Sequence, residues 1–95
     1  MFTNRHYNYG TNKTFTDTYL LSGRLYNDLG LIFTQCHNFT NAAHCFEQAV
    51  SVFHGTSQGS KEEAVVLQNL GAVYNSLGAY DKALKLHESA ASLHG

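Results

Sequence analysis

Apolar residues recur at intervals of three and four positions along most of the chain, and this spacing places side chains on one face of an α-helix. The first such stretch begins near Asp17 and ends near His37, and either Asp17 or Thr18 can cap the helix at its start. Its apolar positions are Leu20, Leu21, Leu25, Leu29, Ile32 and Phe33. Residues 1–16 show no such period and are rich in Asn, Thr and Tyr, so we expect an irregular or disordered tail there.

Three further helices are predicted after this one. The second begins at Phe39 or Thr40 and extends to about Phe53, the third covers about residues 60–77, and the fourth covers about residues 80–93. A short polar or glycine-containing segment precedes each of them, so consecutive helices can fold back on one another as antiparallel hairpins.

Glycines and a capping pattern separate the predicted helices. Gly55 and Gly59 lie between the second and third helices, and Gly78 follows the third, where glycine suits the left-handed conformation of a helix end. Ser60 and Glu63 have the spacing of a capping box, in which a hydroxyl and a carboxylate accept hydrogen bonds from N–H groups at a helix start. We therefore expect the third helix to begin at Ser60.

The two predicted hairpins have related sequences. Equivalent residues are separated by a constant 41 positions in the numbering. The pairs are Leu29 with Leu70, Gly30 with Gly71, Phe33 with Tyr74, Phe39 with Tyr80, Ala42 with Ala83, Glu47 with Glu88, and Ala49 with Ala90. A fixed period of this kind is typical of stacked repeats, in which each unit buries its apolar face against its neighbour.

Small residues inside the helices predict close packing within each hairpin. Gly30 and Gly71 lie in mid-helix, where glycine costs about 1 kcal/mol relative to alanine unless packing compensates. Ala42 and Ala83 stand near the start of the partner helix. We expect each pair of small residues to let the two helices of a hairpin approach closely.

This pattern resembles the tetratricopeptide repeat, which has a bulky residue, Leu-Gly and an aromatic residue in one helix, and Ala, an aromatic residue and Ala in the next. The first copy has Tyr26, Leu29, Gly30, Phe33, Phe39, Ala42, Phe46 and Ala49, and the second has Leu67, Leu70, Gly71, Tyr74, Gly78, Tyr80, Ala83, His87 and Ala90. Three residues depart from the pattern: His87 replaces an aromatic residue, His37 replaces the turn glycine, and Gly95 replaces a final proline.

The resemblance implies an all-α fold. Two helix-turn-helix hairpins, with four antiparallel helices, would stack as a short right-handed α-solenoid behind the disordered N-terminal tail. The first repeat would cover residues 17–56 and the second residues 57–95.

The resemblance also implies a function. It indicates a non-catalytic scaffold that binds a peptide or helix of a partner protein in a concave groove, lined by the first helix of each repeat. Carried over by position, the groove residues are Arg24, Asn27, Leu31, Thr34 and Gln35 in the first repeat and Val65, Gln68, Ala72, Asn75 and Ser76 in the second. This row is polar but almost uncharged, and Asp28 and Asn69, which precede the two Leu-Gly pairs, can add to it. Its side-chain amides both donate and accept hydrogen bonds, which suits the backbone of an extended partner.

Composition excludes several other classes of function. The chain has 95 residues, enough for one small domain, and its formal net charge of -1 provides no field that favours nucleic acid or anionic lipid. No apolar run approaches the ~18 residues of a membrane helix, and the first ten residues lack the apolar stretch of a secretory signal. We therefore expect a cytoplasmic protein with neither a nucleic-acid nor a membrane partner.

No pattern in the sequence indicates catalysis, a cofactor or a metal site. Cys36 and Cys45 match neither a CxxC redox pair nor the spacing of zinc ligands, so we interpret both as reduced thiols. His44 and Cys45 are neighbours in a helix and point about 100° apart, so their adjacency does not pair a nucleophile with a base. The sequence has no glycine-rich phosphate loop, GxSxG elbow or HExxH motif.

A second function remains open at this point. The chain could be a fragment of a longer array of repeats whose exposed hairpin faces drive self-association. Leu20, Leu84 and Leu93 are candidates for these faces, on the outer sides of the first and last helices.

Overall fold

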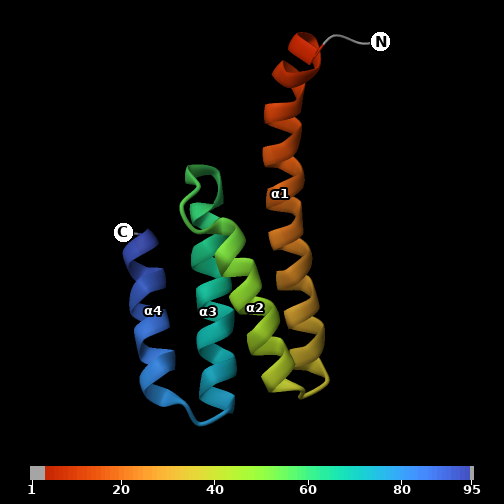
Figure 1. The fold of residues 1–95 in the computed structure, drawn as a ribbon. Coiled ribbons are helices and arrows are strands. Elements are labelled where there is room, and N and C mark those ends of the chain that lie inside the picture. The colour runs from red at the N-terminus through yellow and green to blue at the C-terminus, as the bar shows by residue number, and fades with distance from the viewer. Residues whose placement is uncertain (1–3, 95) are drawn as a thin grey trace.

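The fold consists of two helical hairpins placed side by side. The computed structural model describes the backbone of residues 4–94 and the side chains of residues 15–93. The elements, in order, are α1 (Asn4–Gln35), α2 (Phe39–Phe53), the short 3-10 helix η1 (Ser57–Gly59), α3 (Ser60–Ser76) and α4 (Tyr80–His94). Consecutive α-helices run in opposite directions (Figure 1), so the predicted all-α fold of two antiparallel hairpins is confirmed.

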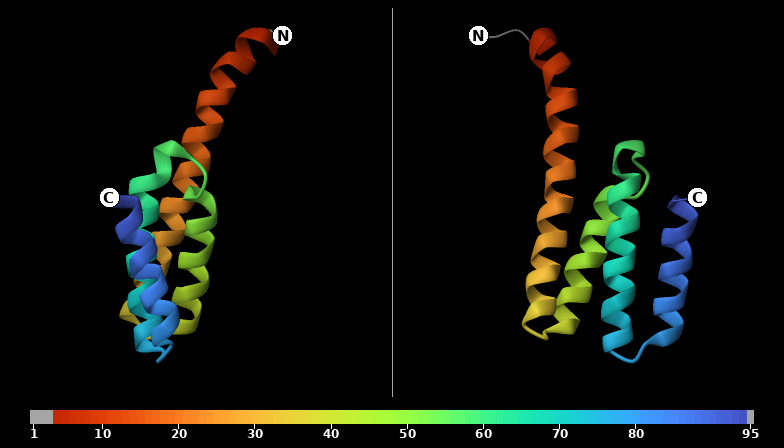
Figure 2. Two further views of the ribbon diagram at one scale, coloured as in Figure 1. Left: turned by 90° about the vertical axis from the view of Figure 1, so that its left-hand side faces the viewer. Right: turned by 180° about the vertical axis from the view of Figure 1, so that it is seen from behind.

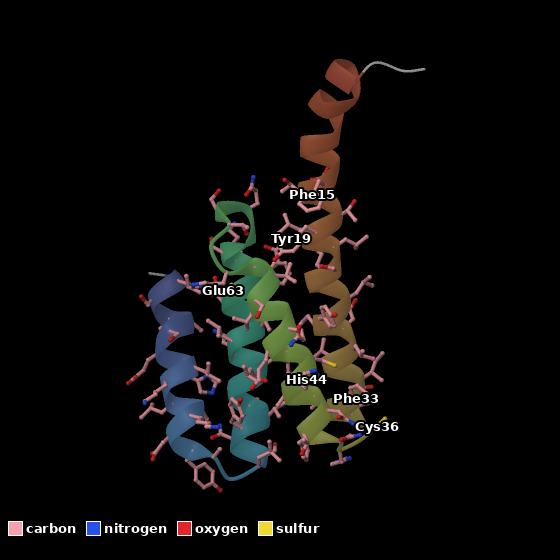
Figure 3. The ribbon with its side chains drawn as sticks, viewed as in Figure 1. Phe15, Tyr19, Phe33, Cys36, His44 and Glu63 are labelled. Atoms are coloured by element: carbon pink, nitrogen blue, oxygen red, sulfur yellow. The ribbon has the colours of Figure 1, made fainter. Side chains whose placement is uncertain are left out.

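The first helix is longer than its apolar pattern predicted. It begins at Asn4, whereas its apolar pattern begins near Asp17, and residues 1–3 of the expected tail lie outside the described residues. Once a turn has formed, each added residue gains a backbone hydrogen bond, and the chain has no proline to end the helix. The first part of α1 extends beyond the other helices (Figure 2). The rings of Phe15 and Tyr19, both on α1, stack on one another with their centroids 6.2 Å apart (Figure 3).

The core is centred on α2, which lies between α1 and α3. Phe46 and Phe53 of α2 are almost completely buried, and Val66 and Val73 of α3 are buried with them. Leu20 of α1 belongs to the same cluster. One apolar core therefore joins the two hairpins, as expected for repeats that cannot bury their apolar faces alone.

The turns within the two hairpins use the same backbone conformation. Gly78 has φ 80°, which confirms the predicted left-handed end of α3. His37 stands at the equivalent position of the first repeat and has φ 60°, although left-handed conformations cost a residue with a Cβ atom roughly 1–2 kcal/mol. The His37 ring lies edge-on to Phe39, with centroids 5.7 Å apart. This aromatic contact offsets part of that cost.

The predicted capping box at the start of α3 is wrong. Gly59 is the N-cap residue, and no side chain caps the helix there. η1 leads directly into α3, so Ser60 already has a helical backbone and is the first residue of the helix. The buried Glu63 instead pairs with Nδ1 of His54, at the end of α2, over 2.8 Å. This pair connects the two hairpins.

The mid-helix glycines provide space for the second-helix aromatic positions. A Cβ atom on Gly30 would lie 2.5 Å from Cε1 of Phe46, and a Cβ atom on Gly71 would lie 2.8 Å from Nε2 of His87. The predicted close approach is therefore present, but each glycine faces the aromatic or histidine ring. Ala42, the small residue expected opposite Gly30, is fully buried.

A hydrogen bond from Tyr74 to Glu47 joins α3 to α2. The phenol of Tyr74 donates to Oε2 of Glu47. Burial, this hydrogen bond and the negative charge of Glu47 together raise the pKa of Tyr74 to about 12. The neutral phenol is thus the form that the folded chain favours.

Alanine substitutions at the two equivalent glycines should have different effects. Gly30→Ala should lower the free energy of unfolding by about 1–2 kcal/mol, because the enclosed Phe46 ring cannot move away and overpacking outweighs the gain in helix propensity. Gly71→Ala should leave the free energy unchanged or raise it by up to about 1 kcal/mol, because the exposed His87 ring can swing aside. Urea unfolding followed by circular dichroism measures both. Equal losses would contradict this packing.

The Tyr74 hydrogen bond predicts a stability change at high pH. The pKa rises from about 10 in the unfolded chain to about 12 in the folded chain, so the stabilisation is present below pH 10 and is lost as the pH rises through 12. Wild type should lose more stability over this interval than Tyr74→Phe. Ultraviolet titration of tyrosinate should also show one late-ionising tyrosine, which ionises earlier in Glu47→Gln. The exposed Tyr80→Phe is the control, and a parallel decline of wild type and Tyr74→Phe would contradict the assignment.

Candidate partner-binding groove

Two polar contacts hold α1 beside α3, although the two helices belong to different hairpins. Nδ2 of Asn69 donates to Oδ1 of Asn27 over 3.0 Å. Arg24 forms an ion pair with Glu62, also at 3.0 Å. Both helices run in the same direction (Figure 1), so equivalent residues of the two repeats lie in the same order along α1 and α3.

A cavity of about 360 Å³ lies between these two helices. Its apolar lining comes from the buried Phe53 and Val66 and from the exposed Val65. Its polar lining consists of Arg24, Asn27, Asp28, Lys61 and Glu62. The cavity thus combines an apolar base with polar and charged residues, the combination by which small sites place and orient a ligand.

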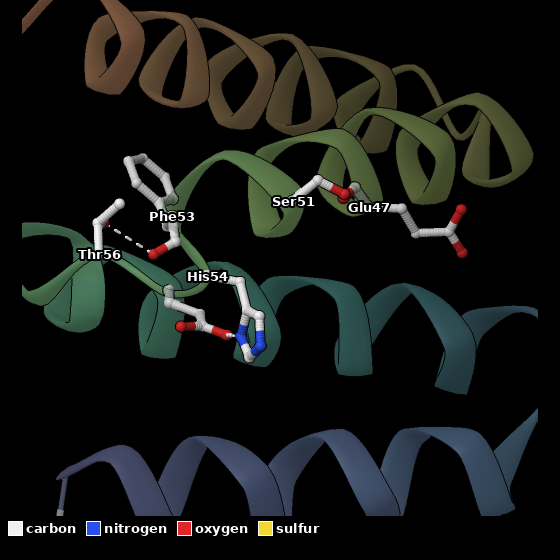
Figure 4. A network of polar contacts seen from close by, with 6 residues as sticks. Glu47, Ser51, Phe53, His54 and Thr56 are labelled. Carbon is white, nitrogen blue, oxygen red and sulfur yellow. Dashed lines mark hydrogen bonds and ion pairs between the residues drawn. The ribbon is translucent and has the colours of Figure 1, made fainter. Parts of the chain in front are cut away.

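Phe53 reaches the cavity because a glycine of α1 leaves room for its ring. A Cβ atom on Gly23 would lie 2.7 Å from Cζ of Phe53. Polar contacts hold the backbone at the same point, where α2 ends (Figure 4): the hydroxyl of Thr56 donates to the carbonyl of Phe53 over 3.0 Å, and His54 pairs with Glu63. The apolar base of the cavity is therefore a fixed part of the core.

The predicted groove residues fall into two groups. Arg24, Asn27 and Val65 line the cavity. The other seven follow along α1 and α3 without lining it: Leu31, Gln35, Gln68, Ala72, Asn75 and Ser76 are exposed, and Thr34 is half-buried. Two of their hydroxyls are used within their own helices, since Thr34 donates to the Gly30 carbonyl and Ser76 to the Ala72 carbonyl.

Charge is the feature of this site that the sequence pattern underestimated. The predicted row was almost uncharged, whereas Lys61 and Glu62 join Arg24 and the adjoining Asp28 around the cavity, which gives two charges of each sign. Lys61 and Glu62 precede the predicted groove residue Val65 by four and three positions. Residues at these spacings are neighbours on a helix surface, so the sequence could have indicated that both lie beside Val65.

The four charges are not equivalent. Arg24 and Glu62 form an ion pair, in which the Arg24 side chain is half exposed and the Glu62 side chain is one-third exposed. Because solvent screens such a pair, it contributes at most about 1 kcal/mol to stability. Within the part of the chain whose side chains are described, Asp28 and Lys61 have no ion-pair partner. Their charges are therefore available to a bound molecule.

Groups that could bind a metal ion do not come together in the described residues. Between residues 15 and 93, no cluster of three or more His, Cys, Asp or Glu side chains could hold a metal ion. Cys36 is exposed at the end of α1, and Cys45 is buried in α2, where burial raises the pKa of its thiol. His44, the neighbour of Cys45, is exposed. Over the same part of the chain, no helix has the length and apolar content needed to cross a bilayer.

The comparison with known families agrees with the fold. The family model described as tetratricopeptide repeat matches residues 21–94. This range contains α2, η1, α3, α4 and the part of α1 that packs against α2. No solved structure matches the chain.

Proposed function

Because the chain belongs to the tetratricopeptide repeat family, we propose that it binds a peptide or helix of a partner protein in the groove between α1 and α3. Repeats of this family serve in general as protein-interaction scaffolds, and they are generally non-catalytic modules. The proposed groove consists of the cavity and the exposed residues that follow it along the two helices.

The cavity is the observation that carries this proposal. Its volume of about 360 Å³ lies within the usual range of roughly 300–1,000 Å³ for binding pockets, and it is large enough for one bulky apolar side chain. Such a side chain would contact Phe53 and Val66, in the way that interface anchors fill apolar pockets. Asp28 and Lys61 would favour a partner that carries a basic and an acidic residue beside this anchor.

The remaining groove residues support contacts to a partner backbone. Gln68 and Asn75 lie on the exposed side of α3, and their amides can donate to a carbonyl and accept from an N–H group. Leu31 offers a separate apolar contact on α1. An extended or helical segment would therefore be held by one anchored side chain and by several weaker polar contacts.

Two finer assignments are also proposals. We place the protein in the cytoplasm, because two free thiols suit a reducing compartment. Within the family, the segments GRLYNDLG, LQNLGAVYNSLGAYDKA and SAASLHG resemble the middle of tetratricopeptide repeat protein 24. On that resemblance we propose a relationship to this part of that protein.

Self-association is the second candidate function, and one observation favours it. Leu21, Leu25, Leu29 and Ile32 form an exposed apolar stripe along α1. Leu20, which the sequence pattern suggested for this surface, is instead buried in the core and is not part of it. Leu84 and Leu93 of α4 are exposed, as that hypothesis requires.

The groove proposal can be tested by peptide selection on the full chain. Peptides selected from a random displayed library should bind wild type, and Val65→Glu should weaken them at least about tenfold, because a carboxylate then lies beside the apolar base. Lys61→Glu should alter which flanking charges the selected peptides carry. Isothermal titration calorimetry measures the affinities.

Leu84→Glu is the matched control for this experiment. It makes the same change at an exposed apolar residue of α4, outside the cavity, and should alter peptide affinity less than about twofold. Peptides that bind Val65→Glu as tightly as wild type would place the binding surface elsewhere and contradict the groove proposal.

A further inference from the structure

The apolar stripe of α1 has a buried counterpart inside the same molecule. Three residues of the stripe have an equivalent in α3, 41 positions later, that is apolar and belongs to the core. The pairs, with their exposed fractions, are Leu25 (59%) and Val66 (1%), Leu29 (42%) and Leu70 (4%), and Ile32 (55%) and Val73 (2%). The same helix face is therefore covered in the second repeat and uncovered in the first.

The element that covers this face of α3 is α2. Val66, Leu70 and Val73 share one buried cluster with Ala43 of α2, and Val50 of α2 packs against that cluster. Glu47 lies on the same side of α2, because it accepts the hydrogen bond from Tyr74 of α3. The contact between α2 and α3 therefore shows which kind of surface fits the α1 stripe.

α4 carries the corresponding surface, and no described helix packs on it. Ala83 and Ala90 of α4 are buried within their hairpin just as Ala42 and Ala49 of α2 are, so both helices have the same orientation relative to their partners. The position equivalent to the buried Ala43 is Leu84, which is exposed. The face that α2 directs at α3 is thus free on α4.

From these equivalences we infer that α1 of one copy packs against α4 of a second copy, in the manner in which α3 packs against α2 within one chain. A fixed rotation and translation relates the first hairpin to the second. When the same movement is applied to the second hairpin, it gives the position of the first hairpin of another copy. The apolar stripe on α1 of that copy then contacts the face of α4 that contains Leu84. This assignment builds on the second candidate function and involves surfaces outside the groove. The contact is head-to-tail, so each copy retains one free face and the assembly can extend.

The contact between copies is weaker than the contact within a chain. Phe33 stands where α3 has Tyr74, and it has no hydroxyl to donate to Glu88, the equivalent of Glu47. The hydrogen bond that joins α2 to α3 is therefore missing from the junction. Apolar burial remains as the main attraction, and the association depends on protein concentration.

Analytical ultracentrifugation of the full chain over a concentration series tests this arrangement. The mass of wild type should increase with concentration and pass that of a dimer. Leu25→Glu and Leu84→Glu should each weaken association at least about tenfold, because each buries an unpaired charge at the junction. An equimolar mixture of the two variants should form dimers and nothing larger, because each supplies the one intact face that the other lacks.

Val65→Glu is the matched control, since it places the same charge on an exposed apolar residue of the groove. It should associate like wild type and yet lose peptide binding, so failure of the groove and failure of the junction can be distinguished. A wild-type chain that stays monomeric would overturn both the junction and self-association. If the mass of wild type does not pass that of a dimer, and the mixture of the two variants does not associate, the head-to-tail geometry is overturned and self-association still stands.

Discussion

Two phenylalanine rings of α2 occupy the space that two glycines of α1 leave open, and the rest of the structure depends on this packing. Phe46 lies against Gly30 and Phe53 lies against Gly23. The rings bring α1 close to α2 at two points along their length, and α2 then offers its other side to α3. Because interiors are packed as densely as organic crystals, a methyl group at either glycine would displace a ring that is almost fully enclosed.

Phe53 also connects the core to the cavity of the proposed groove. Its ring is part of the central apolar cluster, and it forms part of the base of the cavity between α1 and α3. The contacts of Thr56 and His54 hold the chain at the same point. A partner side chain that enters the cavity would therefore meet a surface that is already ordered, which lowers the entropic cost of binding.

The two hairpins share one plan but differ in how tightly they are packed. The first places a buried phenylalanine against its glycine, whereas the second places the exposed His87 against Gly71. α2 has a helix on each side, while α4 packs mainly against α3 among the described helices. A repeat array draws much of its stability from the interfaces between neighbouring units, and in the described residues α1 and α4 are the helices that leave a row or face of leucines exposed.

The fold could be predicted from the sequence because local patterns agree with one another. Helical periodicity, the constant offset between the repeats and the left-handed glycine after α3 all indicate two hairpins. α3 begins at Ser60 as expected, but the predicted cap failed where neighbouring elements intervened: η1 leads directly into α3, and Glu63 pairs with His54 of the other hairpin and does not cap its own helix. Of the predicted groove residues, Arg24, Asn27 and Val65 line the cavity.

The sequence by itself determined the helical fold and the pairing of helices into hairpins. These features follow from the spacing of apolar residues within each helix and from the sequence similarity between the two repeats. Only the tertiary structure decided that Arg24 meets Glu62, that Asp28 and Lys61 border one cavity, and that Leu20 is buried while Leu21 is not. The physical reason is that such contacts join residues distant in the chain and depend on how closely the helices approach, which the rings of Phe46 and Phe53 determine.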